Sequence, residues 1–245
     1  MTRKNTVFVI LGGFFLTNSI LAEMIGGKLI FVGGPDLRIG PLGPFRMSIG
    51  IIPWPVVFVV TDLINEYFGR KGVQRLSFLA VGMISYVFVV LALTRLIDAA
   101  PVSPTGVDDA SYNKVFGSTM WIIVGSILAF LTSQIIDVFI FHLVRRRTGK
   151  AFLWLRATGS TIISQIIDSV IVLYIGLAIP YQMTLKQFVE LAVPNYLVKL
   201  VIALLMTPLI YLGHWLVEMY LGKSLAESIA EEAALESAGV GAANG

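Results

Sequence analysis

Long, continuous apolar runs dominate the chain. Each is about as long as a transmembrane helix, which needs roughly 20 residues, and none alternates like the strands of a membrane barrel. We expect six membrane-spanning helices, within residues 7–32, 49–68, 73–97, 116–144, 157–180 and 188–220. The pattern predicts an all-α, polytopic membrane protein with a six-helix domain over residues 1–222. An acidic, partly disordered cytoplasmic tail is expected over residues 223–245.

Glycine and proline predict three breaks in this pattern. Gly26-Gly27 is expected to loosen or end the first helix near its outer end. The segment that follows, residues 33–44, is rich in glycine and proline and predicts an outer plug or a hairpin. Pro53 and Pro55 are expected to kink the second span.

Composition agrees with the membrane assignment and excludes several kinds of site. Hydrophobic residues make up 56% and charged residues 13% of the chain, whereas soluble domains carry about 25% charged residues. The absence of cysteine excludes disulfides, thiolate metal sites and a cysteine nucleophile. His142 and His214 are too few for a histidine-based metal site. We therefore expect neither a metal nor a cofactor, and no enzymatic activity.

Basic residues concentrate in alternate loops. The N-terminal end, the second loop and the fourth loop carry most of them: Arg3, Lys4, Arg70, Lys71, Arg75, Arg145, Arg146, Arg147, Lys150 and Arg156. Cytoplasmic loops are enriched in lysine and arginine, so both termini are predicted in the cytoplasm. The net charge of +3 is then a topology signal rather than a nucleic-acid-binding patch.

One polar motif occurs twice inside the apolar runs. Ser133-Gln134-Ile135-Ile136-Asp137 is followed by Ser164-Gln165-Ile166-Ile167-Asp168. A carboxylate in the bilayer core costs about 2.5–3.5 kcal/mol, so such residues usually face the bundle interior and mark a substrate or ion pathway. Glutamine and aspartate three residues apart share one helix face. Each helix therefore presents an amide and a carboxylate to the same space.

Other polar residues lie in the remaining apolar runs. The predicted substrate-binding set is Asn18, Glu23, Asp62, Glu66, Gln134, Asp137, Gln165, Asp168, Asn195 and Lys199. Structural roles stay open for several of them. Lys199 could neutralise Asp137 and Asp168, and Glu66 could pair with Arg70. Glu23 could form a gate with Lys28, and the two asparagines could simply join helices.

The chemistry of this set indicates the class of solute. A carrier of phosphates or organic anions would need clustered arginine or lysine, and a metal carrier would need histidine, cysteine or dense acids. Carboxylates and amides suit a flat polar solute with several N–H donors and a carbonyl acceptor. A guanine-like base has these groups.

Three segments together resemble the queuosine precursor transporter family, also called the vitamin-uptake-like family. They are Asp62-x-x-x-Glu66-Tyr67-Phe68-Gly69-Arg70-Lys71, Ser133-Gln134-x-x-Asp137 and Trp154-Leu155-Arg156-x-x-x-Ser160-x-x-x-Ser164-Gln165-x-x-Asp168. The resemblance implies uptake of 7-cyano-7-deazaguanine across a bacterial inner membrane, with 7-aminomethyl-7-deazaguanine as a second candidate. It also implies a six-helix fold similar to the substrate-binding component of energy-coupling-factor vitamin transporters.

The sequence thus predicts a solitary secondary transporter or facilitator. The main alternative is a substrate-binding subunit of an ATP-driven vitamin transporter. Less favoured are an intramembrane aspartyl protease with Asp137 and Asp168 as its dyad, and a channel. The expected partners are the small-molecule substrate and membrane lipid, without nucleic acid. Gly12-Gly13 permits a homodimer but does not require one.

Overall fold

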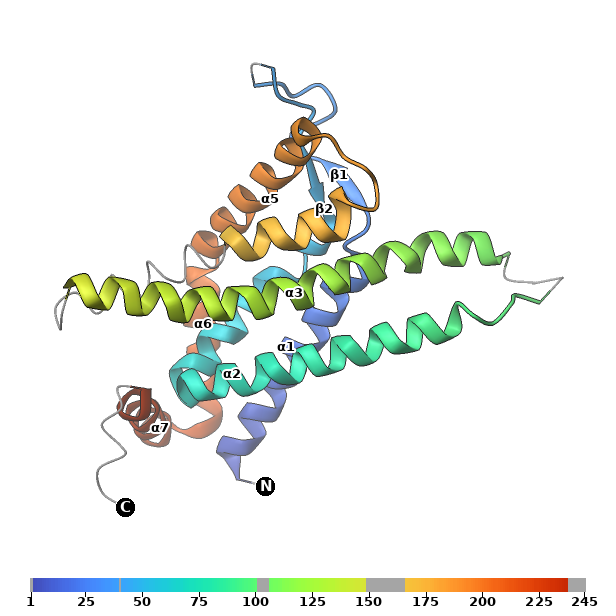
Figure 1. Cartoon of the computed structure of the whole chain (residues 1–245). Coiled ribbons are helices and arrows are strands. Elements are labelled where there is room, and N and C mark those ends of the chain that lie inside the picture. Colours follow the sequence, from blue (N-terminus) through green and yellow to red (C-terminus); the bar gives the residue numbers. More distant parts are fainter. Residues whose placement is uncertain (1, 40, 101–105, 149–165, 238–245) are drawn as a thin grey trace. The chain divides into compact units, whose positions relative to one another are not determined.

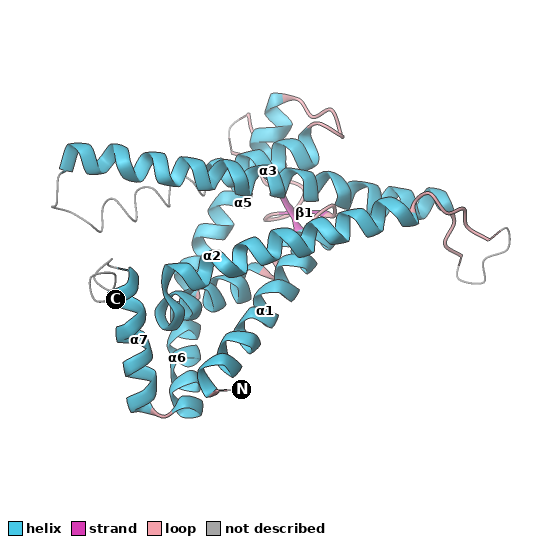
Figure 2. Cartoon of the chain, turned by 60° about the horizontal axis from the view of Figure 1, so that its bottom comes forward, coloured by secondary structure: helices cyan, strands magenta, loops and turns pink. Residues whose placement is uncertain are grey.

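The computed structural model describes residues 2–39, 41–100, 106–148 and 166–237 of the chain, and the side chains at 70, 134, 135, 137–148, 203, 204, 207 and 235–237 fall outside that description. Helices make up most of the described chain, and two short strands are the exception (Figures 1 and 2). The labelled elements are α1 (Arg3–Ile25), β1 (Leu29–Phe31), β2 (Arg46–Ser48), η1 (Ile49–Ile51), α2 (Trp54–Thr94), α3 (Asp109–Thr148), η2 (Tyr174–Ala178), α5 (Leu185–Leu205), α6 (Thr207–Leu221) and α7 (Lys223–Ser237).

Within the part of the chain that the structure describes, four helical segments are long and apolar enough to cross a membrane. They are Arg3–Ile25, Ile49–Gly69, Lys71–Thr94 and Asp109–Ser133, and they match the first four predicted spans. The described part of the fifth span is a shorter apolar helix, Ile166–Ala178. The chain therefore folds as a helical protein with several segments of transmembrane type, as the hydrophobic pattern predicts.

The sixth predicted span is not a single helix. Residues 188–220 contain most of α5 and most of α6, which begins at Thr207 after Met206. Pro208 lies in the first turn of α6, where a missing N–H is tolerated. The same proline inside a continuous helix would remove a hydrogen bond and clash with the preceding turn. The segment predicted as the sixth span is therefore two helices that meet at Met206 rather than one continuous helix.

The chain divides into two compact units, which we describe separately. Unit 1 comprises Met1–Ala22, Gly50–Ile84 and Val198–Gly245, and unit 2 comprises Glu23–Ile49 and Ser85–Leu197. The core of unit 1 joins α1, α2, α6 and α7. Its buried residues are Val7, Leu11, Val60, Leu63, Ile64, Tyr67, Leu76, Val217, Leu221, Ala226 and Ile229.

The C-terminal helix α7 is part of that core. Ala226 and Ile229 are buried on one of its faces, and Glu232 forms a 2.8 Å ion pair with Lys4 at the start of α1. The segment predicted as an acidic tail therefore begins with a helix, Lys223–Ser237, and the apolar stripe of this helix packs in the core of unit 1.

Helix α2 changes direction at Gly69. This residue has φ 63° and ψ −175°, a conformation that interrupts the helix between two spanning segments and that only glycine adopts without strain. The predicted second and third spans are thus joined directly at Gly69. Pro53 and Pro55 lie where the regular α-helix of the second span begins, between η1 and the first turn of α2.

Helix α1 ends at Ile25, just before Gly26-Gly27, as predicted. The chain then forms β1, so the outer residues of the first predicted span are not helical. Two hydroxyl groups satisfy carbonyl groups that the end of a helix leaves free: Thr119 Oγ1 donates to Met24 O at 3.1 Å, and Ser48 Oγ donates to Gly26 O at 2.6 Å. Of the two forms predicted for the following segment, the hairpin is observed: β1 and β2 pair antiparallel, with Ile30 opposite Met47.

In unit 2, α3 packs closely against the helix that ends in η2. A methyl group on Gly125 would lie 2.9 Å from the carbonyl oxygen of Val172, and one on Gly176 would lie 3.0 Å from Ile122 Cα. Small residues of this kind let membrane helices approach each other. The surrounding core contains Ile122, Leu173, Leu177 and Leu191.

Candidate functional site

The repeated Ser-Gln-x-x-Asp motif lies only partly within the described residues. Gln134 and Asp137 belong to the helical backbone of α3, but their side chains are outside the description, and Gln165 lies outside it altogether. Asp168 is described. It is half-buried near the start of the helix Ile166–Ala178, next to the buried Ser169.

The helix of Asp168 runs antiparallel to α3. Gly176 faces Ile122, whereas Gly125 faces Val172. The residue numbers therefore rise along one helix where they fall along the other. Asp168 lies about one turn before Val172. It is therefore displaced from the glycine contact toward the end of α3 that carries Gln134 and Asp137.

The same helix contains a π-helical turn. η2 spans Tyr174–Ala178, and the N–H of Ile179 donates to the carbonyl of Tyr174 at 2.9 Å, five residues earlier. Such turns occur mostly as single interruptions of α-helices and frequently at functional sites. Here the turn lies at Gly176, the point of closest approach to α3.

Glu23 joins α1 to α3. Its Oε2 accepts a hydrogen bond of 2.9 Å from Ser126 Oγ, and its side chain is half-buried. This contact lies one residue from the bond between Thr119 and Met24. Glu23 is thus engaged within unit 2, while Lys28, its predicted gate partner, is exposed.

Asn195 on α5 is buried and holds the β-hairpin. Its Oδ1 accepts from the backbone N–H of Ser48 at 3.2 Å, and its Nδ2 donates to Leu191 O at 2.7 Å. Only 5% of the residue is exposed. The predicted substrate-binding amide is therefore already bonded to backbone atoms, which favours the structural role that the sequence left open.

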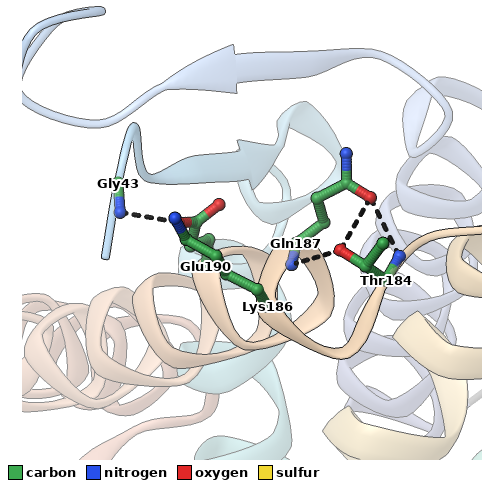
Figure 3. A network of polar contacts seen from close by, with 5 residues as sticks. All are labelled: Gly43, Thr184, Lys186, Gln187 and Glu190. Atoms are coloured by element: carbon green, nitrogen blue, oxygen red, sulfur yellow. Dashed lines mark hydrogen bonds and ion pairs between the residues drawn. The ribbon is translucent and has the colours of Figure 1, made fainter. Parts of the chain in front are cut away.

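A second polar network ties the same hairpin to the start of α5 (Figure 3). Glu190 Oε1 accepts from the backbone N–H of Gly43 at 2.7 Å. Just before the helix, Thr184 and Gln187 form reciprocal side-chain-to-backbone bonds of 3.3 and 2.9 Å. This is a capping box, which satisfies free N–H groups at a helix start. Glu190 and Asn195 together fasten both ends of the β2 segment to α5.

In unit 1, Asp62 and Glu66 lie on the exposed face of α2. Leu63, Ile64 and Tyr67 on the opposite face are buried in the core. The predicted carboxylates therefore share one helix face, as their spacing of four residues requires.

The two other candidates of unit 1 also have defined neighbours. Asn18 Nδ2 donates to Phe14 O at 2.8 Å within its own helix. The Lys199 ammonium lies 4.1 Å from the centre of the Trp54 ring, and the Trp54 and Phe58 rings are 5.5 Å apart. Lys199 thus lies over a flat aromatic surface at the start of α2, a cation–π arrangement.

Sequence reasoning missed three groups of polar residues. The Thr184-x-x-Gln187 capping signature is visible in the sequence, but Glu190 has no sequence signal because its partner is a backbone N–H 147 residues away. Tyr67 and His214 are likewise 147 residues apart and are hydrogen-bonded. Only the packing of α6 on α2 brings them together.

Comparison with known proteins agrees with the resemblance of the motifs. A family model described as "Putative vitamin uptake transporter" matches residues 48–213. A curated protein named "Probable queuosine precursor transporter", from Bacillus subtilis (strain 168), is 27% identical over 168 residues, covering 67% of this chain and 70% of its own length. No solved structure matches the chain. The region matched by the family contains every predicted site residue except Asn18 and Glu23.

Proposed function

Since the chain belongs to the family of vitamin uptake transporters, we propose that it imports queuosine precursors across the bacterial inner membrane, with 7-cyano-7-deazaguanine as the first substrate. The similarity to the transporter of Bacillus subtilis supports the substrate class. 7-Aminomethyl-7-deazaguanine, which carries the same guanine-like edge, is the second candidate. The proposed arrangement is six membrane crossings with both termini in the cytoplasm, resembling the substrate-binding component of energy-coupling-factor transporters.

The observation that carries the proposal is the position of Asp168. A half-buried carboxylate on an apolar helix lies toward the part of α3 that carries Gln134 and Asp137. We propose that Asp168, Asp137 and the two motif glutamines bind the base. The carboxylates would accept from the ring N–H and the exocyclic amine, and the amides would bond the remaining acceptor groups.

Unit 1, taken by itself, contains further candidate groups for a flat polar solute. Trp54 offers a flat surface of the kind on which bases stack, and Lys199 lies over it. Asp62 and Glu66 lie on an exposed face of the same helix. Asn18 and Glu23 are proposed to support the path of the substrate rather than its binding, because both are bonded within the protein.

Binding to the purified protein tests the proposal. We expect saturable binding of 7-cyano-7-deazaguanine, competed weakly by guanine. Asp168→Asn keeps the shape of the side chain but removes the charge, and a bond to a charged group contributes about 1.5–3 kcal/mol, so affinity should fall about 10- to 100-fold. Asp98→Asn, at an exposed position after the third span, is the matched control and should bind like wild type.

The alternatives predict different outcomes. A folded sample that binds no precursor contradicts the proposed substrate. Co-purification with an ATPase subunit would indicate an ATP-driven complex instead of a solitary transporter. Peptide cleavage that Asp168→Asn abolishes would indicate the protease, whose two carboxylates must share a proton.

A further inference from the structure

A tyrosine and a histidine meet where α6 packs against α2. Tyr67 Oη lies 3.1 Å from His214 Nδ1, and the two ring centres are 5.5 Å apart. Tyr67 is only 3% exposed. The adjacent contact is tight, since a methyl group on Gly213 would lie 2.8 Å from Leu63 Cδ1. The pair is therefore a fixed part of the unit 1 core.

Three carboxylates lie on the two helices that form this pair, each within five residues of Tyr67 or His214 along the chain. Asp62 lies close enough to His214 for electrostatic attraction, and Glu66 and Glu218 both act electrostatically on Tyr67. Asp62 and Glu66 are one turn apart on α2, and His214 and Glu218 are one turn apart on α6. The other helices of this core, α1 and α7, contribute apolar side chains to it. The pair thus has negatively charged neighbours on both helices that form it.

A contact between two helices does not need a tyrosine, a histidine and three carboxylates. Histidine changes charge close to neutral pH, and chains of Asp, Glu and His inside membrane segments commonly relay protons. Metal coupling is a poor fit, because the described residues contain no group of three or more His, Asp or Glu placed to hold a metal ion. The chemistry of the cluster favours the proton as its ligand.

We propose that His214, with Tyr67 and Asp62, forms a proton-binding site that couples precursor uptake to proton entry. This inference rests on the proposed transport function. In the neutral state, the Tyr67 hydroxyl donates a hydrogen bond to Nδ1 of His214. When the imidazole takes up a proton from water, Nδ1 becomes a donor, so the bond must reverse direction. The new positive charge then attracts Asp62.

Asp62 connects this site to the substrate. It is one of the predicted substrate-binding carboxylates and lies on the same helix as Tyr67, five residues earlier. A charge on His214 therefore changes the electrostatic potential at a proposed substrate group. A proton on His214 places a positive charge near Asp62 and so stabilises the charged carboxylate that accepts from the N–H donors of the substrate. Each of the two binding events therefore favours the other.

Transport by the purified protein in proteoliposomes tests the coupling. The substrate is labelled 7-cyano-7-deazaguanine, and the pH outside the liposomes is one unit lower than inside. This inwardly directed proton gradient should sustain up to about tenfold accumulation of substrate if one proton enters with each substrate molecule. At a pH where His214 is neutral, His214→Gln should bind and exchange substrate like wild type, but it should lose gradient-driven accumulation. Tyr67→Phe keeps the ring and should shift the pH profile of uptake. Tyr211→Phe, at an exposed position on α6, is the control and should accumulate normally.

The outcomes separate the two proposals. Normal binding and exchange in the variants show that they fold. Wild-type uptake that ignores the gradient while binding is normal overturns the coupling, as does full accumulation by His214→Gln. Absence of precursor binding by wild-type protein overturns the proposed substrate and, with it, coupling to that substrate.

Discussion

Glu190 on α5 accepts a 2.7 Å hydrogen bond from the backbone N–H of Gly43, in the segment between β1 and β2 (Figure 3). The Glu190 side chain is 9% exposed, and its ion pair with Lys186 is long, at 3.9 Å. The bond to Gly43 is thus the closer of the two contacts. It ties a glycine- and proline-rich segment to a helix of the same unit.

Removing this carboxylate should loosen the hairpin. Glu190→Ala leaves the Gly43 N–H without its acceptor, and a lost partner of this kind costs about 1–3 kcal/mol. We expect a lower melting temperature of the detergent-solubilised protein and faster hydrogen exchange over residues 41–48. Lys186→Ala is the control, because a pair exposed on one side contributes about 0–1 kcal/mol. Equal effects of the two substitutions would show that the Gly43 bond does not hold the segment.

The glycine contact between α3 and the helix Ile166–Ala178 should tolerate no larger residue. In Gly125→Ala, the new methyl group would lie 2.9 Å from Val172 O and 3.1 Å from Gly176 N. Both are backbone atoms that cannot rotate away, so we expect a loss of about 1–3 kcal/mol from overpacking. Thermal unfolding measures it.

Gly82→Ala is the matched control for this contact. Gly82 lies in α2, and a methyl group there would meet nothing within 4 Å. Alanine favours helix over glycine by about 0.5–1 kcal/mol, so this variant should be at least as stable as wild type. If Gly125→Ala unfolds at the same temperature as Gly82→Ala, the two helices are not in the close contact seen here.

Local sequence signals predicted the helix ends better than the helix partners. The end of α1 before Gly26-Gly27 follows from glycine chemistry, and four of the six spans predicted from the apolar runs match spanning helices of the described chain. The joint at Gly69 was not predicted, because a single glycine with positive φ can replace a whole loop. The break before α6 was overlooked although Pro208 signals it, because the apolar pattern continues through the break.

The residues of the candidate site could be predicted from the sequence, but their individual roles could not. The high cost of burying charge in a membrane singled out Asp168, which lies half-buried on an apolar helix. The same argument could not distinguish a binding amide from an anchoring one. Asn195 was selected as polar and intramembrane, yet its partners are backbone atoms of a hairpin 147 residues away. Such contacts depend on tertiary packing and produce no periodic pattern in the amino-acid sequence.

Asn195 should therefore affect stability rather than affinity. Asn195→Leu keeps the branched shape of the side chain, at a larger volume, but removes the acceptor for Ser48 N–H and the donor to Leu191 O. We expect about 1–3 kcal/mol lower stability. The dissociation constant for 7-cyano-7-deazaguanine, measured below the melting temperature, should stay within about twofold of wild type. A much weaker affinity in a folded variant would return Asn195 to the set of substrate ligands.

The start of α3 should depend on pH through Asp108. Asp108 Oδ1 accepts from the backbone N–H of Ser111 at 2.8 Å, as expected for an N-cap. Hydrogen bonds from the Ser111 side chain and backbone hold the pKa of Asp108 below its ordinary value of 3.8. A lowered pKa means that the ionised form stabilises the fold. This contribution is fully present above pH 3.8 and is lost as the pH falls through the lower, folded-state pKa.

Ser111→Ala separates the two hydrogen bonds. The substitution removes the hydroxyl, which makes the largest contribution to the shift, and keeps the backbone N–H. The pKa of Asp108 should therefore rise toward 3.8 without reaching it, and the start of α3 should fray at a higher pH than in wild type. A carboxyl ¹³C titration of the protein in nanodiscs measures both pKa values. An unchanged pKa would mean that the positive end of the helix dipole and the backbone N–H, rather than the Ser111 hydroxyl, keep this carboxylate charged.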